Sequence, residues 1–210
     1  MDSNIIGGLD ENISSHPAGV LIGMGGYGFL GVQSREIGAL LFCVGLYGVL
    51  VLGVPLYTGR CGYAFQKGSP SIGGYALMLL GNLAGAALVG LAFGPMGAGA
   101  KDVAAMALSK LSQPFLETLL RGIGCGMMMF IAVDSWKRLA GAERALGVLL
   151  AVPVFILAGF EHCIADAFYF AAAFSKGAML DARLVPFMIS AIIGNTLGAL
   201  AVYFLSPRKE

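Results

Sequence analysis

Six long apolar runs, separated by short polar segments, constrain this chain more than any other feature of its sequence. Each run is long enough to cross a bilayer if a few flanking residues are added or the helix tilts. Hydrophobic residues make up 58% of the chain, and charged residues make up 12%, about half of the roughly 25% usual in soluble domains. We therefore expect an all-α integral membrane protein with six transmembrane helices. The runs are Ala18–Val32, Ile37–Pro55, Ile72–Gly94, Leu119–Val133, Ala145–Phe160 and Leu184–Leu205.

The length of the chain leaves no room for a further soluble domain. Six spans of about 20 residues take up roughly 120 positions, and the connections and ends account for the rest of the 210 residues. We expect one membrane domain over residues 18–206, an N-terminal cytoplasmic segment over 1–17 and a C-terminal tail over 207–210. The N-terminal segment contains no Lys or Arg, unlike a cleaved signal peptide. The 13 basic and 12 acidic residues nearly balance, so no basic face for nucleic acid is expected.

A short motif that occurs twice indicates an internal repeat. Gly81-Asn82-Leu83-Ala84-Gly85-Ala86 is matched 113 residues later by Gly194-Asn195-Thr196-Leu197-Gly198-Ala199. In each half a polar interruption precedes the motif, at Thr58 and at His162. Residues 18–95 and 115–206 therefore correspond to two three-helix units, and the second is inverted because three spans reverse the direction of the chain. Inverted repeats with interrupted helices are typical of transporters with a site near the bilayer midplane.

The glycines of this motif have a simpler explanation in close helix packing. The pairs Gly81/Gly85 and Gly194/Gly198 are GxxxG motifs, which allow two helices to approach closely. Packing does not explain the asparagines, because an asparagine is costly in lipid unless it faces protein or water. We therefore expect Asn82 and Asn195 to contribute to the centre of a pore.

Four ionisable residues, Arg121, Glu161, His162 and Asp166, are nearest to membrane depth. Intramembrane charges are functional candidates by default. His162 and Asp166 are four residues apart, so they share one face of a helix, while Glu161 points elsewhere. The alternative for His162 is a buried histidine satisfied by the backbone. Its position in a glycine-flanked break beside two carboxylates favours a role in a pore.

No motif for catalysis or cofactor binding accompanies these residues. The sequence has no nucleophile elbow, HExxH motif or P-loop, so we expect neither an enzyme nor a bound cofactor. A metal site is not expected either, because consecutive residues such as Glu161, His162 and Cys163 point in different directions on a helix. The four cysteines form no CxxC pair and are expected to be free and buried.

Several motifs in order resemble those of the formate/nitrite transporter family. Gly159-Phe160-Glu161-His162-Cys163-Ile164-Ala165 is similar to the signature of that family's fifth span, and Leu56-Tyr57-Thr58 is similar to the loop of its first break. The GN motifs at Asn82 and Asn195 resemble those of its third and sixth spans. Arg121-Gly122-Ile123, followed by Cys125, resembles the start of its fourth span. The resemblance covers residues 18–206.

The resemblance implies an aquaporin-like fold with helices 2 and 5 broken, assembled as a homopentamer with one pore per subunit. It also implies a central His162 facing Thr58, with Asn82 and Asn195 close by. Hydrophobic constrictions flank this centre, formed by Phe42 and Leu46 on one side and by Phe155 on the other, with Tyr57 beside Thr58.

Two residues depart from the pattern of the family, since Asp166 and Gly126 stand where it has asparagines. Asp166 has three possible roles in proton and charge tuning. It can pair with His162 and favour the imidazolium. It can serve the fold, if Asp166 or Glu161 pairs with Arg121. It can also be neutral, or face outward.

The expected function is transport of small monovalent weak-acid anions, with formate the leading substrate and nitrite and hydrosulfide as further candidates. A channel and a proton-coupled carrier both remain open, because a weak acid avoids the cost of an apolar gate by crossing as the neutral acid. The rivals are an aquaporin-like channel for small neutral solutes, which lacks support because the NPA motifs are missing, and a structural membrane subunit.

The expected location is the inner (plasma) membrane, with both chain ends cytoplasmic. With the ends inside, seven basic residues face the cytoplasm and six face outward, which favours this orientation only slightly. The inner set is Arg60, Lys67, Lys137, Arg138, Arg144, Arg208 and Lys209, and the outer set is Arg35, Lys101, Lys110, Arg121, Lys176 and Arg183. The expected partners are the anion, protons and the lipid bilayer.

Overall fold

The computed structural model describes residues 15–96 and 101–206, and every regular element in these two ranges is a helix. The all-α class is therefore confirmed. Most of the predicted N-terminal segment and the whole predicted tail lie outside the described residues. The helices are α1 His16–Leu30, α2 Arg35–Leu52, α3 Tyr57–Arg60, α4 Ile72–Phe93, α5 Val103–Leu111, α6 Phe115–Arg138, α7 Glu143–Leu157, α8 Cys163–Ser175 and α9 Leu184–Leu205, with short 3-10 helices η2 Cys61–Tyr63 and η3 Gly94–Met96.

Polar side chains set the starts of several helices. The Ser34 hydroxyl accepts a hydrogen bond from the N–H of Ile37 at the start of α2, and Ser71 accepts one from Gly74 at the start of α4. Asp102 caps α5 in the same way. Such caps satisfy N–H groups that have no partner within the helix. The apolar runs of the sequence can therefore begin as helices at defined residues.

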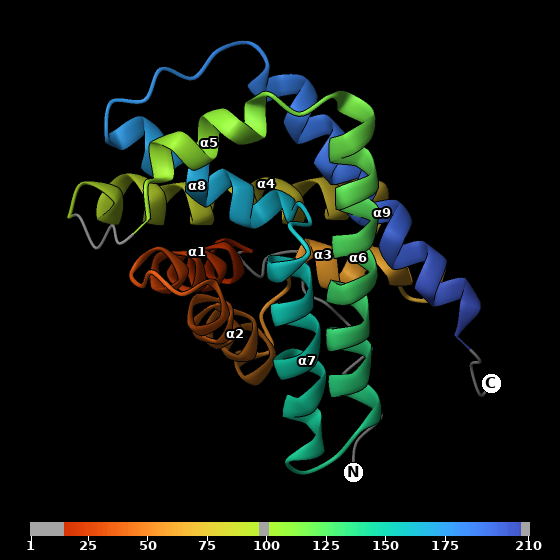
Figure 1. Cartoon of the computed structure of the whole chain (residues 1–210). Coiled ribbons are helices and arrows are strands. Elements are labelled where there is room, and N and C mark those ends of the chain that lie inside the picture. Colours follow the sequence, from red (N-terminus) through yellow and green to blue (C-terminus); the bar gives the residue numbers. More distant parts are fainter. Residues whose placement is uncertain (1–14, 97–100, 207–210) are drawn as a thin grey trace.

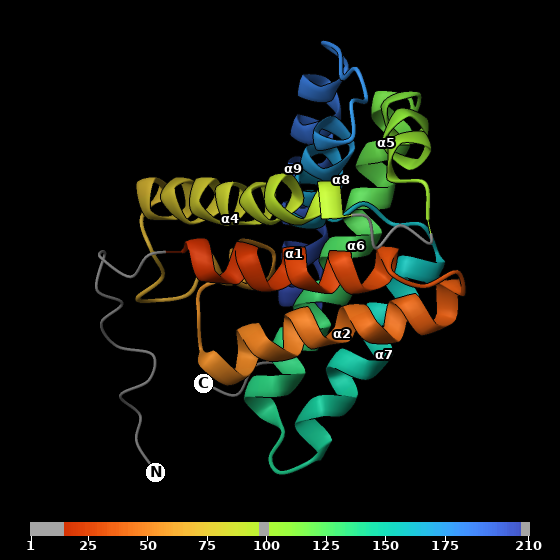
Figure 2. The same ribbon diagram turned by 90° about the vertical axis from the view of Figure 1, so that its left-hand side faces the viewer.

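The helices form two groups of similar arrangement. In the first group, α1 lies between α2 and α4 and contacts both (Figure 2). In the second, α6 lies between α7 and α9 and contacts both (Figure 1). Contacts of α2 with α7 and of α4 with α8 join the groups. This correspondence agrees with two related three-helix units, although the six-span inverted repeat stays a prediction.

The chain leaves the helical conformation at two matching places. The helix α2 ends at Leu52, and Gly53 adopts a φ of 67°, in the left-handed region that glycine tolerates best. The chain then runs to α3, which begins at Tyr57. In the second group α7 ends at Leu157, Gly159 has a φ of 70°, and α8 begins at Cys163.

Four helices are long and apolar enough to cross a membrane, among the residues that the structure describes. They are α2, α4 with its 3-10 extension to Met96, α6 and α9, and α8 is a shorter apolar helix. The helices α1 and α7 have 15 residues each. All four cysteines are buried and free, as predicted.

Glycines bring the helices that carry the two asparagines close to their neighbours. A Cβ atom at Gly19 would overlap the carbonyl oxygen of Asn82, and one at Gly126 would overlap that of Asn195. The helix pairs α1–α4 and α6–α9 therefore meet at matching glycines, which agrees with the packing role predicted for such residues. Gly126 stands where the family has an asparagine, and the structure gives a reason, because α6 and α9 are too close here for a larger side chain.

Candidate functional site

The two interruptions meet at a buried contact between Thr58 and His162. The hydroxyl oxygen of Thr58 lies 3.0 Å from Nε2 of His162, and the two residues are 0% and 1% exposed. His162 also caps α8, since its Nδ1 accepts a hydrogen bond from the N–H of Ala165 at 3.0 Å. A nitrogen that accepts carries no proton, so the neutral ring holds its proton on Nε2 and donates it to Thr58. The predicted pairing of these two residues is present.

Asn195 holds the second interruption together. Its Oδ1 accepts a hydrogen bond from the N–H of Cys163, the first residue of α8. Its amide nitrogen donates to the carbonyl of Glu161 at 2.7 Å and to that of Gly122 on α6 at 2.9 Å. One side chain thus binds the end of the interruption, the first residue of α8 and the neighbouring helix α6.

Asn82 makes the equivalent set of bonds at the first interruption. Its Oδ1 accepts from the N–H of Tyr57 at 2.8 Å, at the start of α3. Its amide nitrogen donates to the carbonyls of Pro55 and Ser15. Both asparagines are completely buried, and both donate all their amide hydrogens to backbone carbonyls. We call Asn82 and Asn195, with these bonds, the asparagine clamps.

An apolar wall of aromatic rings lies against His162. The rings of Phe42 and Phe155 are 5.6 Å apart at 84°, and Phe155 stacks against His162 at 5.8 Å. Phe42, Phe155 and Leu46 are all buried. Because the two phenylalanine rings are in contact, the prediction that Phe42 and Phe155 stand on opposite sides of His162 is wrong. Tyr57 turns its hydroxyl toward α9, where it lies 2.9 Å from the hydroxyl of Thr196.

A buried charged cluster lies beside the second interruption, formed by Lys110, Glu161 and Asp166. The Lys110 ammonium forms ion pairs with both carboxylates and lies 3.0 Å from Oδ1 of Asp166. Gln113 donates a hydrogen bond to Glu161 at 2.8 Å. Asp166 therefore pairs with neither His162 nor Arg121, and it does not face outward, since it is 1% exposed. Lys110 reaches both partners from a different helix, α5.

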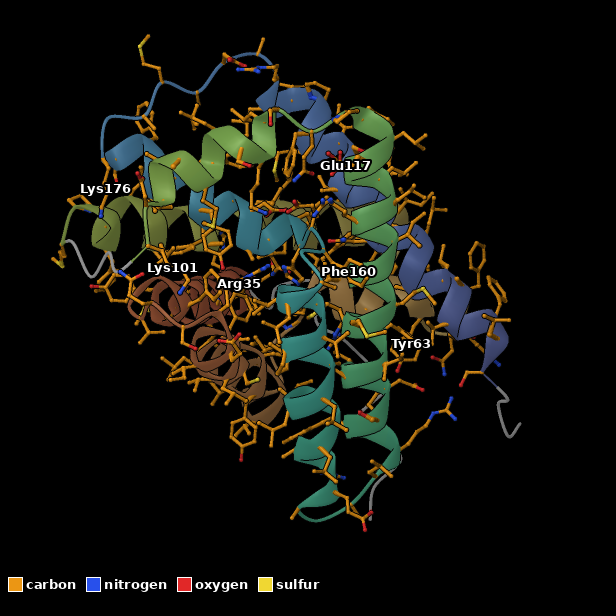
Figure 3. The ribbon with its side chains drawn as sticks, viewed as in Figure 1. Arg35, Tyr63, Lys101, Glu117, Phe160 and Lys176 are labelled. Atoms are coloured by element: carbon orange, nitrogen blue, oxygen red, sulfur yellow. The ribbon has the colours of Figure 1, made fainter. Side chains whose placement is uncertain are left out.

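Arg121 instead binds the backbone where α7 ends. It pairs with Glu117 one turn earlier on α6, and it donates to the carbonyl of Gly159 at 2.8 Å. Arg35 donates to the carbonyl of Ile156 at 2.9 Å. Two cations thus face the carbonyl end of α7, where the helix dipole is negative. Phe160 lies at the same junction, next to α6 (Figure 3).

Sequence reasoning missed Lys110 and Gln113 as parts of this site. Lys110 lies in a more polar stretch between two apolar runs, so we interpreted it only as a charged residue of a loop. A signal was present, because Val103, Ala107 and Leu111 are buried at helical spacing and Lys110 lies next to that face. An amphipathic helix between two spans is easily overlooked when only long runs are sought.

Comparison with known proteins gives consistent relatives. The family model described as formate/nitrite transporter matches residues 10–207. The uncharacterized transporter YrhG of Bacillus subtilis is 29% identical over 198 residues, which cover 86% of this chain and 74% of the relative. The nitrite transporter NirC of Escherichia coli is 26% identical, covering 94% and 84%. The formate channel FocA of Haemophilus influenzae is 28% identical, covering 64% and 52%.

Solved structures share the fold. A structure described as an FNT family ion channel superposes with a TM-score of 0.80 at 25% identity, covering 93% of this chain and 89% of the other. A pentameric formate channel with formate bound gives a TM-score of 0.79 at 20% identity, covering 93% and 94%. The arrangement of helices described above is therefore one that anion channels use.

Proposed function

This chain belongs to the formate/nitrite transporter family, and on that premise we propose that it carries small monovalent weak-acid anions across a membrane, with formate first among them. Nitrite and hydrosulfide are further candidate substrates. The observation that carries the proposal is the buried contact of Thr58 with His162. It joins the two helix interruptions at a polar centre enclosed by apolar side chains.

The anion is stabilised at this centre by donors aimed at it. Thr58 supplies a hydroxyl, and His162 supplies the Nε2–H that donates to Thr58 when no anion is present. The N-terminal end of α8 adds a partial positive charge. Phe42, Leu46 and Phe155 form an apolar constriction that excludes hydrated ions. Asn82 and Asn195 position these groups, because their amide hydrogens are all donated to the backbone.

A proton accompanies the anion through the constriction, because a neutral acid passes an apolar gate at far lower cost than a carboxylate. His162 acts here as a hydrogen-bond donor. The loss of its Nε2 proton would leave an imidazolate, since Nδ1 already accepts from Ala165. We therefore assign the accompanying proton to hydronium in the aqueous phase at the mouth of the pathway, which becomes water when it protonates the anion. An inward proton gradient is expected to accelerate formate uptake.

The working form is a homopentamer of six-span subunits in the inner membrane, with both chain ends cytoplasmic. Support comes from the pentameric formate channel that shares the fold. A second argument is the outer face of α2, which presents a continuous apolar stripe that lipid or a neighbouring subunit must cover. That stripe is Ile37, Leu40, Leu41, Val44, Tyr47 and Val51.

A comparison of two His162 variants in reconstituted vesicles tests the proposed function. His162→Asn keeps a side chain that caps helices well, but the shorter asparagine loses the Nε2–H that donates to Thr58. We expect formate uptake to fall by about tenfold or more, since a hydrogen bond to a charged group contributes roughly 1.5–3 kcal/mol. His162→Phe loses the cap as well, so both uptake and thermal stability should decrease.

Empty vesicles and His16→Asn protein serve as controls. Wild-type vesicles that exclude formate but swell in urea or glycerol would point to the neutral-solute alternative. Uptake by His162→Asn protein at the wild-type rate would remove His162 from the pathway.

A further inference from the structure

A cavity of about 670 Å³ opens on the face where α2 and α6 end and α7 begins. It extends from the end of α2 to α3, so its wall includes Leu56, Gly59 and Arg60, immediately around Thr58. Four basic side chains also line it, Arg60, Lys67, Lys137 and Arg144, and none of the described residues that line it is acidic. We call this cavity the basic vestibule.

Arg60 differs from the other arginines of the described residues because its guanidinium has no hydrogen-bond or ion-pair partner among them. Its backbone carbonyl accepts a hydrogen bond from the Tyr75 hydroxyl at 3.2 Å, but its guanidinium forms no hydrogen bond or ion pair within the described residues. Arg35, Arg121, Arg138, Arg144 and Arg183 each donate at least one. The Arg60 side chain is half-buried, so it has lost water without gaining a protein partner.

An anion is the partner that this arrangement lacks. A guanidinium presents a planar fork of N–H donors that matches a carboxylate or nitrite in bidentate fashion. The other basic side chains raise the potential of the cavity, and its apolar walls focus that field. Arg60 lies two residues after Thr58 on α3, next to the polar centre.

We propose that Arg60 is the anion-binding residue of the basic vestibule, where a small monovalent anion docks before it moves to Thr58 and His162. This position in the pathway rests on the proposed function, whereas the binding itself does not. The vestibule collects anions from the aqueous phase on the face where α2 and α6 end, and Arg60 holds one beside Thr58.

Trp136 provides a reporter inside the same cavity. It is the one tryptophan of the chain, it lines the vestibule, and it packs against Tyr47 and Arg144. Iodide quenches tryptophan fluorescence on contact and is a monovalent anion, whereas acrylamide is a neutral quencher. The ratio of the two quenching constants therefore measures how strongly the vestibule concentrates anions.

The experiment compares detergent-solubilised wild-type, Arg60→Gln and Arg60→Lys proteins at constant ionic strength. Arg60→Gln should lower the iodide quenching constant by about two- to threefold, the factor for an interaction of about one RT with a unit charge, and should leave acrylamide quenching unchanged. Added formate should displace iodide in a saturable way in the wild type and not in Arg60→Gln. Arg60→Lys should keep the iodide effect and bind formate more weakly, because the fork is lost.

Lys176→Gln is the matched control, because Lys176 is an exposed cation that caps the far end of α8. In Figure 3 it lies at the opposite side of the molecule from Tyr63, a vestibule residue. The Lys176→Gln protein should match the wild type in both quenching constants and in the displacement of iodide by formate. Equal iodide constants in wild type and Arg60→Gln, or formate displacement that survives in Arg60→Gln, would overturn the proposal. Arg60-dependent displacement in a protein that moves no formate would instead overturn the proposed function alone.

Discussion

At the scale of single residues, Lys110 forms ion pairs with the two most deeply buried carboxylates of the described residues. Its ammonium lies between Glu161 and Asp166, which are 2% and 1% exposed. Asp166 Oδ2 has no hydrogen-bond partner within the described structure. The cluster therefore holds one cation against two carboxylates, in a place where an unpaired charge is costly.

We expect Lys110→Met to destabilise the protein by about 3–5 kcal/mol, the usual cost of removing one partner of a buried ion pair. Asp166→Asn removes one of two neighbouring carboxylates and should be nearly neutral on its own. Combined with Lys110→Met, it should recover part of the lost stability, since one fewer buried charge is stranded. Denaturation of the detergent-solubilised protein measures all three variants.

Lys176→Met is the control for the loss of a lysine as such, because Lys176 is exposed. If the effects of Lys110→Met and Asp166→Asn on the free energy of unfolding simply add, with no recovery in the double variant, Lys110 and Asp166 do not interact energetically.

At the residue level, the expected contact is present where a motif gave both residues, and a partner was missed where it had to be chosen. The resemblance to the family implied that His162 faces Thr58, and the two are in contact, while their role in a pore stays a prediction. The partners considered for Asp166 were His162 on the same helix and Arg121 at the start of the fourth span. Its real partner, Lys110, comes from a separate helix, and spacing along one helix carries no information about such a contact.

At the scale of elements, the asparagine clamps define the two interruptions. Each asparagine makes three hydrogen bonds to the backbone, and each is completely buried. Removal of either side chain leaves a helix-start N–H group and a carbonyl outside the helices without their partner. An unsatisfied buried group costs roughly 1–3 kcal/mol, so each clamp contributes measurably to the stability of the fold.

We expect Asn195→Ala and Asn82→Ala each to destabilise the protein by about 3 kcal/mol or more. Both variants should also lose formate uptake, because the donors at the helix interruption are no longer held in place. Leu197→Ala, on the exposed face of α9, is the matched control and should have little effect on either. A wild-type melting temperature for Asn195→Ala would show that the clamp bonds are dispensable.

The helices themselves were largely predictable. The six apolar runs correspond to α1, α2, α4, α6, α7 and α9, with ends that differ by a few residues. Long apolar runs specify helices in lipid, because the backbone must satisfy its own hydrogen bonds there. The helix α5 was missed because it is short and apolar on one face only, and it carries Lys110.

At the scale of the whole molecule, two similar groups of helices present different faces to the two aqueous sides. The face where α2 and α6 end carries the basic vestibule. The opposite face carries the loop between α1 and α2, and the helix α5 (Figures 1 and 2). Counting basic residues barely distinguished these faces, because the count ignores which charges are neutralised. Lys110, Arg121 and Arg183 are all ion-paired, whereas Arg60 is not.

The asparagine clamps also affect how the rate of formate flux depends on temperature. Each fixes the last residues of an interruption and the first residue of the helix that follows it, so we expect that end of each interruption not to serve as a hinge. Passage that needed no hinge would have a small activation enthalpy, and the rate of formate flux would rise only gently on warming. A steep Arrhenius slope in vesicles, far above that for formate diffusing in water, would reveal a large rearrangement in each cycle. We expect the shallow slope of a rigid conduit.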